Sequence, residues 1–232
     1  MIYLITFVSI PTLSLYGPVR NDPNYILGPG PDTSILVGAV LEVIVALACI
    51  GTAVVLYPVV KRQHEGVALG FVGARVLEAA TIFAGVVSLL SVVTLRQSGA
   101  GADALATGQA LVAFNNWTFL LGQSFLPVVN ALLLGSLLYR SRLVPRIIPL
   151  VGVIGAPLLL TSDVGVLFGF WPQVSALTAS GALPIAVWEF SLGIYLVIKG
   201  FKPSPITDEV IPADTPPAHH AASPGLRLSK SL

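Results

Sequence analysis

Long runs of hydrophobic residues, separated by short polar stretches, follow one another along most of the chain. Six such segments can be drawn, at about residues 1–16, 34–60, 66–95, 108–138, 146–170 and 182–200. An α-helix rises about 1.5 Å per residue, so roughly 20 apolar residues cross the hydrocarbon layer of a membrane. The pattern therefore predicts an all-α fold, a polytopic membrane bundle of six transmembrane helices over residues 1–202.

The first of these segments is the shortest. Met1 stands directly in apolar sequence, and Gly17 and Pro18 end the run. The segment lacks the basic start and the small-residue cleavage pattern of a secretory signal. We interpret it as a first spanning helix, whose natural start can lie upstream of Met1, and keep a cleaved signal peptide as the alternative.

Basic residues gather in alternate loops between the segments. One basic loop covers residues 61–65, a second covers residues 139–146, and Lys199 and Lys202 follow the last helix. Lysine and arginine near the ends of spanning helices favour the cytoplasmic side of a membrane. The pattern predicts that both chain termini and both basic loops face the cytoplasm.

The last stretch of the chain, residues 203–232, has a different character. It is rich in Pro, Ala and Ser and shows no apolar periodicity. Such a composition cannot bury a core, so it predicts a disordered cytoplasmic tail. We interpret its His219–His220 pair as solvated side chains rather than metal ligands.

Composition strengthens the membrane interpretation. Hydrophobic residues make up 55% of the 232 and charged residues 10%, against about 25% charged in an ordinary soluble domain. The mean hydropathy is +0.88. The net charge of +1 gives no field that would favour nucleic acid. A lipid bilayer is therefore the expected partner, nucleic acid is not, and the oligomeric state stays open.

The charged and amide side chains inside the apolar segments are the candidate functional groups. An ionised group at the centre of a spanning helix costs about 2.5–3.5 kcal/mol, so these groups must face the bundle interior or water. Four acids cannot all be ionised beside one arginine unless a proton, a cation or water enters. We predict an intramembrane polar or ion site formed by Glu42, Arg75, Glu78, Asn116, Asp163 and Glu189.

Arg75 and Glu78 are three residues apart, so they share one face of a helix and can pair. The planar guanidinium can also reach a carboxylate on another helix, because it serves two acceptors. One interpretation is a structural ion pair that fixes how the helices pack. The other is a site for a proton, a cation or a small molecule.

Several kinds of chemistry have no residues to carry them. No histidine lies in the apolar segments, which excludes haem held by paired histidines within the membrane. There is no HExxH motif, no pair of cysteines and no glycine-rich phosphate loop with a lysine. We expect no cofactor and no metal. Enzymatic chemistry is left with carboxylates, as in a lipid-modifying enzyme that uses acid–base catalysis.

Three stretches, residues 41–82, 139–169 and 188–201, resemble a known bacterial family. They include WEFSLGIYLVIKGF and YRSRLVPRIIPLVGVIGAP, and the similarity extends over residues 1 to about 202. The family is the one named domain of unknown function 4386. The resemblance implies a multi-helix protein of the bacterial plasma membrane with no established activity, and it assigns no catalytic residue. Family members usually carry a basic segment before the first helix, which this chain lacks.

Two functional hypotheses remain. In the first, the chain is a non-enzymatic integral membrane protein, a scaffold or partner whose buried polar network holds the bundle together. In the second, it is a small transporter or a carrier coupled to protons or cations, with the intramembrane carboxylates as its site. The carrier hypothesis requires the acids to converge on a cavity that opens to one side.

Overall fold

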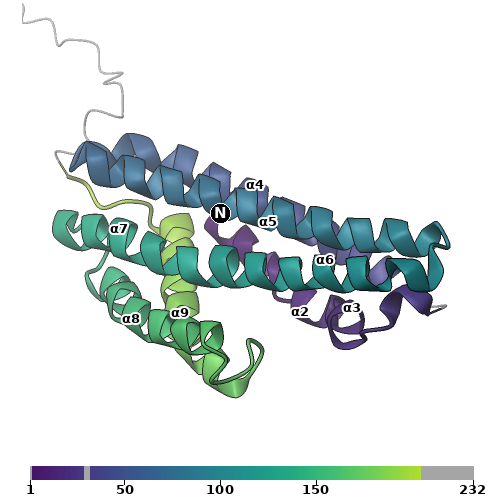
Figure 1. The fold of residues 1–232 in the computed structure, drawn as a ribbon. Helices are drawn as coiled ribbons and strands as arrows, with labels where there is room; N and C mark the ends of the chain where they lie inside the picture. Colours follow the sequence, from purple (N-terminus) through teal and green to yellow (C-terminus); the bar gives the residue numbers. More distant parts are fainter. Residues whose placement is uncertain (1, 29–31, 205–232) are drawn as a thin grey trace, which may run out of the picture.

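The computed structural model describes residues 2–28 and 32–204, and these residues form helices and no strand (Figure 1). The all-α prediction is confirmed. Residues 205–232, which make up nearly all of the predicted disordered tail, lie outside the described residues.

Five helical segments are long and apolar enough to cross a membrane. They are α4 (Thr33–Val60), α5 (Glu65–Gln97), a continuous run over Gly101–Ser141, α8 (Ile147–Leu167) and α9 (Ala176–Ile198). The continuous run consists of η3 (Gly101–Ala104), α6 (Leu105–Thr118), η4 (Phe119–Phe125) and α7 (Leu126–Ser141). Large apolar side chains such as Val54 and Val87 project outward from these helices. A surface of this kind is suited to lipid rather than water.

The first predicted span, residues 1–16, is not a continuous helix. The described chain is broken into α1 (Ile2–Ile5), η1 (Thr6–Ser9), α2 (Thr12–Leu15), α3 (Gly17–Asn21) and η2 (Tyr25–Leu27). The apolar stretch Tyr3–Leu15 is shorter than a membrane span. Pro11 explains one break, because it has no N–H to donate and its ring obstructs the preceding turn. The described chain therefore has five helices of spanning length instead of six.

The helices pack in chain order. α5 contacts α4, α6 and α7, while α8 lies between α7 and α9. The N-terminal segment packs against two helices that are distant in sequence: α1 contacts both α4 and α9, and η1 contacts α4 (Figure 1). It therefore lines the interior between α4 and α9 and contributes to any site there.

The basic stretches lie at one end of the bundle. Val60, Leu143 and Val144 belong to one buried cluster, against which Phe201 packs. The backbone N–H of Lys202 donates a hydrogen bond of 2.9 Å to the carbonyl of Leu143. The two basic loops and the residues after α9 are therefore neighbours at one end of the bundle.

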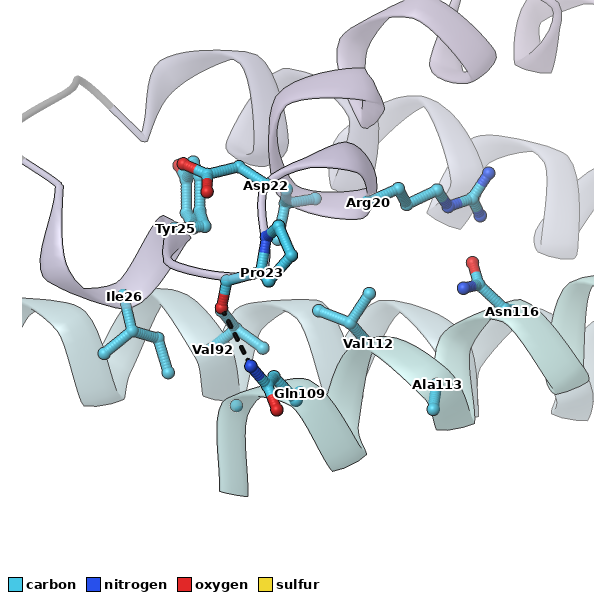
Figure 2. A pocket seen from close by; sticks show the side chains of 12 residues that line it. Arg20, Asp22, Pro23, Tyr25, Ile26, Val92, Gln109, Val112, Ala113 and Asn116 are labelled. Carbon is cyan, nitrogen blue, oxygen red and sulfur yellow. Dashed lines mark hydrogen bonds between the residues drawn. The ribbon is translucent and has the colours of Figure 1, made fainter. Parts of the chain in front are cut away.

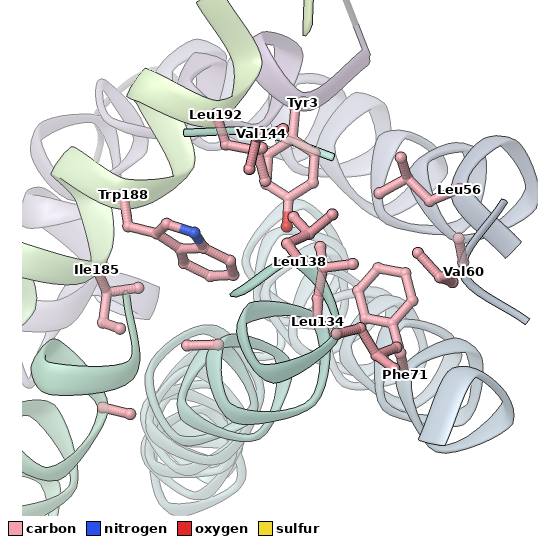
Figure 3. Packing of buried hydrophobic residues seen from close by; sticks show 14 of the residues in the cluster. Tyr3, Leu56, Val60, Phe71, Leu134, Leu138, Val144, Ile185, Trp188 and Leu192 are labelled. Atoms are coloured by element: carbon pink, nitrogen blue, oxygen red, sulfur yellow. The ribbon is translucent and has the colours of Figure 1, made fainter. Parts of the chain in front are cut away.

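Trp188 on α9 is the largest fully buried side chain of the described structure. Its indole packs among Ile185, Leu138 and other apolar side chains of the cluster (Figure 3). Gly152 on α8 leaves room for the ring: a Cβ atom there would lie 2.5 Å from Cδ2 of Trp188. The close approach of α8 and α9 therefore depends on a glycine at this position.

We expect Gly152→Ala to lower the melting temperature of the detergent-purified protein by several degrees, because overpacking costs about 1–3 kcal/mol. Gly73→Ala is the matched control. Gly73 lies inside α5, and a methyl group added there would meet no other atom within 4 Å. Both changes gain the same helix propensity. Equal melting temperatures for the two variants would show that Trp188 does not need the space.

Candidate functional site

Three of the predicted site residues meet in the interior of the bundle. Arg75 and Glu78 lie on α5, and Glu189 reaches them from α9. We call these three residues the central charged cluster. The helical spacing brings Arg75 and Glu78 to one face of α5, and the packing of α9 near the N-terminal segment supplies the third member.

Arg75 is the centre of this cluster and is 1% exposed. Its Nη1 lies 2.8 Å from Oε2 of Glu78, and its Nη2 lies 3.7 Å from Oε1 of Glu189. The guanidinium also lies over the ring of Tyr3, 5.0 Å from the ring centroid. Nη1 is 3.8 Å from Sγ of Cys49 on α4. The one arginine therefore touches groups from four elements: α1, α4, α5 and α9.

The two glutamates of the cluster have different surroundings. Glu78 accepts short hydrogen bonds on Oε2, from Arg75 and, at 2.7 Å, from Nδ2 of Asn130 on α7. Glu189 is too far from Arg75 for a hydrogen bond, and within the described structure its buried Oε1 has no hydrogen-bond partner. Nη2 and Nε of Arg75 are likewise without partners there. One acid is tied into the bundle, and the other keeps an unused acceptor.

A cavity of about 210 Å³ adjoins the cluster. Arg75, Glu78 and Glu189 all line it, and so do Gln123 and Ser124 of η4. We call it the central cavity. Its deep walls come from buried residues of α4, α5, α7 and α8, whereas most of its lining residues from η1, η4 and α9 are partly exposed. The cavity therefore opens on the side formed by η1, η4 and α9, where the Glu189 side chain is 13% exposed.

The two η4 residues of the cavity wall connect it to the remaining acids. Nε2 of Gln123 donates to Oε1 of Glu42 on α4, at 3.2 Å. The hydroxyl of Ser124 donates to Oδ1 of Asp163 on α8, at 2.5 Å. Glu42 and Asp163 are both buried, but neither lines the cavity itself. Two consecutive residues thus link acids on two different helices to one polar wall.

This linkage depends on the π-helical geometry of η4. Pro127, the second residue of α7, cannot donate to the carbonyl of Gln123, a hydrogen bond that a regular helix would require. A widened turn relieves such a defect, and π-helical turns often occur at functional sites. The proline is a signal that the sequence carries, but neither Gln123 nor Ser124 is among the predicted site residues.

Asn116, the sixth predicted residue, is apart from the acids. It lies in the last turn of α6 and does not line the central cavity, and its backbone carbonyl accepts from Nε2 of Gln173 at 3.1 Å. Its neighbour Asn115 is the buried one. Asn115 accepts from Arg20 at 2.7 Å and donates to the carbonyl of Gly85 at 3.0 Å. A helix turns about 100° per residue, so choosing between adjacent asparagines from sequence was not possible.

A second pocket of about 220 Å³ lies between α6 and the segment of α3 and η2. Arg20 and Asn116 are at one end of it and Asp22 and Tyr25 at the other (Figure 2). Gln109 closes one side by donating to the carbonyl of Pro23 at 3.2 Å. The pocket is at the end of the bundle opposite the basic loops, away from the central charged cluster.

Neighbouring contacts hold this end of the bundle together. Arg96 pairs with Asp32 at 2.8 Å and lies over the ring of Tyr25, 4.5 Å from its centroid. The Tyr25 hydroxyl donates to Asp32 at 3.1 Å. Burial and this hydrogen bond raise the pKa of Tyr25 above its ordinary value. These contacts hold the segment before α4 against the end of α5, so we interpret them as structural.

No group of three or more His, Cys, Asp or Glu residues that could hold a metal ion is found within residues 2–28 and 32–204. The central charged cluster provides instead one guanidinium and two carboxylates, with hydroxyl and amide groups beside the same cavity. Such a set can hold helices together, exchange a proton, or bind a small charged molecule.

Residues 1–200 match one protein family, described as a domain of unknown function (DUF4386). No curated protein and no solved structure matches the chain.

Proposed function

Starting from the fact that the chain belongs to the DUF4386 family, we propose that it is a non-enzymatic, multi-pass protein of the bacterial plasma membrane. In this proposal the buried polar network, with Arg75 at its centre, holds the helices in register. The two basic loops and both chain termini are cytoplasmic, and the pocket beside Arg20 faces the other side, following the positive-inside rule.

One observation carries the structural role. Arg75 bonds Glu78 on its own helix, and Asn130 of α7 donates to the same carboxylate oxygen. Glu189 of α9 lies on the other side of the guanidinium. Lipid is as apolar as leucine, so hydrophobic burial gives little preference for one helix pairing over another within a membrane. Contacts between polar groups therefore contribute more to determining which helix faces pack against each other.

Glu78→Gln tests this role. We expect the change to cost about 2–3 kcal/mol, because it removes the closest counter-charge of a buried arginine. The melting temperature in detergent should fall by roughly 5–10 °C. Glu65→Gln is the matched control, since Glu65 is exposed at the start of α5. A Glu78→Gln protein as stable as its control would refute the structural role.

A second candidate function is a carrier coupled to protons or cations. The specific observation that favours it is the central cavity, which brings two of the four predicted acids to one opening and reaches the other two through Gln123 and Ser124. Purified protein in liposomes should then support a proton or cation flux that Glu189→Gln abolishes. Wild-type liposomes without flux from about pH 5 to pH 8 would exclude the carrier and leave the structural role untouched.

A further inference from the structure

The lining of the central cavity is amphipathic. Its charged groups all belong to the central charged cluster, and its hydroxyl and amide groups come from η1 and η4. The rest of the wall is apolar, formed by Phe7, Ile10, Val45, Ile82, Pro127, Leu159, Ala182, Ile185 and Ala186. A ligand that fits this wall has one charged end and a hydrocarbon part.

The charge balance of the cluster indicates the sign of that end. Glu78 neutralises Arg75 at 2.8 Å, which leaves Glu189 as the surplus acid when both are ionised. A surplus charge inside a membrane protein is costly unless a counter-charge joins it. The missing charge is therefore positive, and its place is beside Glu189.

Unused hydrogen-bonding capacity marks the same place. The buried Oε1 of Glu189 accepts no hydrogen bond within the described residues, and the Glu189 side chain is 13% exposed at the cavity opening. Nη2 of Arg75, the nearest cationic group, lies 3.7 Å from this oxygen and also makes no hydrogen bond there. Buried polar atoms of this kind are rarely left unsatisfied, and the free carboxylate oxygen points to an occupant with a hydrogen-bond donor.

The cavity is better suited to an organic cation than to a metal ion. Hard metal ions need about six or more oxygen ligands in a close shell, and the described residues contain no group of three acidic, histidine or cysteine side chains that could hold a metal ion. An ammonium group needs only one carboxylate and a few neutral acceptors. Phe7 adds an aromatic ring to the wall, a favourable surface for a cation.

We propose that the central cavity binds a small organic ammonium ion, whose charged group lies on the Glu189 carboxylate and whose alkyl part lies on the apolar wall. This inference rests on the second candidate function and names its class of substrate. The partly exposed side of the cavity, formed by residues of η1, η4 and α9, carries both polar and apolar side chains, so an amphipathic ligand enters there.

In this site, the ammonium ion and a proton compete for the carboxylate of Glu189. The ionisable groups that face Glu189 are Arg75 and Glu78 from α5, Tyr3 from α1 and Cys49 from α4. Asp163 of α8 is held by Ser124. Glu189, whose Oε1 accepts no hydrogen bond within the described residues, is the group that exchanges a proton for the ammonium ion. Occupancy by one excludes the other.

The test is calorimetric titration of the detergent-purified full chain with butylammonium chloride. We expect saturable binding of butylammonium. As the pH falls through the range in which Glu189 takes up a proton, the affinity should weaken roughly tenfold per pH unit. Sodium chloride, 1-butanol and sodium butyrate are the comparison ligands, and none should compete at equal concentration. Competition by sodium would overturn the organic class, and equal binding of butanol or butyrate would overturn the role of charge.

Three variants locate the site. Glu189→Gln should weaken butylammonium binding at least tenfold, since a lost charged partner costs about 2 kcal/mol or more. Ala186→Phe, which fills the opening and keeps Glu189, should do the same if the first variant folds poorly. Glu65→Gln is the matched control, because Glu65 is exposed at the start of α5 and does not line the cavity. Unchanged binding in both folded cavity variants would refute the proposal.

The outcome can be separated from that of the proposed function. If butylammonium binds and no flux occurs in liposomes, the site stands and the carrier does not. If no ammonium probe binds while Glu78→Gln still lowers the melting temperature, the ligand inference fails and the structural network stands.

Discussion

Replacing Arg75 by glutamine is expected to lower the free energy of unfolding by about 3–5 kcal/mol, the largest loss for any single charge in this chain. The guanidinium is 1% exposed and is the only cation of the central charged cluster. Without it, the carboxylates of Glu78 and Glu189 face each other across the interior with no counter-charge. Removing one partner of a buried pair costs more than the pair itself contributes, because the remaining charge stays desolvated.

The measurement is thermal unfolding of the detergent-purified protein, with an expected fall on the order of 10 °C. Arg140→Gln serves as the control, because Arg140 is exposed at the end of α7. The double variant Arg75→Gln with Glu78→Gln should recover part of the loss, since it removes the uncompensated acid as well. A double variant less stable than Arg75→Gln alone would contradict the pairing.

Trp188→Ala is expected to have the second largest effect, about 3 kcal/mol. The side chain is 0% exposed and packs against α8 at Gly152. Moving an apolar group between protein and lipid gains little, so the loss comes mainly from the cavity and the lost dispersion contacts. The melting temperature should fall by roughly 6–12 °C.

Trp117→Ala makes the same change on a residue that is 49% exposed. We expect it to leave the melting temperature within about 2 °C, because its ring leaves no enclosed cavity behind. Similar losses for Trp117→Ala and Trp188→Ala would mean that α8 and α9 are not held by this packing.

The long helices follow from hydropathy alone. Segments of about 20 or more apolar residues have one stable form in a membrane, so α4, α5 and α8 lie close to their predicted positions. α9 begins at Ala176, ahead of the predicted start at residue 182. Ser175 and Thr178 form a capping box there, a signal that hydropathy does not contain.

The N-terminal segment was harder to predict. Its composition suits a spanning helix, but Pro11 and Pro18 divide it into short pieces, of which α1 packs between α4 and α9. Hydropathy measures how apolar a stretch is, but it does not show where a helix within that stretch ends. Tyr3 and Thr6 become part of the central charged cluster's surroundings for this reason, and no sequence pattern indicated it.

The candidate site could be predicted in kind and only partly in detail. The free-energy cost of placing a charge in the hydrocarbon layer singled out the ionisable residues within the apolar segments. Arg75 does reach a second carboxylate on another helix, that of Glu189. Glu78 differs from Glu189 partly because it accepts a hydrogen bond from Asn130 of α7. Whether Asn130 can reach Glu78 depends on how α7 is rotated about its axis. The same rotation makes Asn115 rather than Asn116 the buried asparagine.

We propose different tasks for the two glutamates beside Arg75: Glu78 holds the helices together, and Glu189 exchanges a proton for a cation. Side-by-side melting curves of Glu78→Gln and Glu189→Gln in one detergent test this division most directly. We expect a fall of roughly 5–10 °C for Glu78→Gln and a change within about 3 °C for Glu189→Gln. Equal falls, or a larger fall for Glu189→Gln, would contradict it.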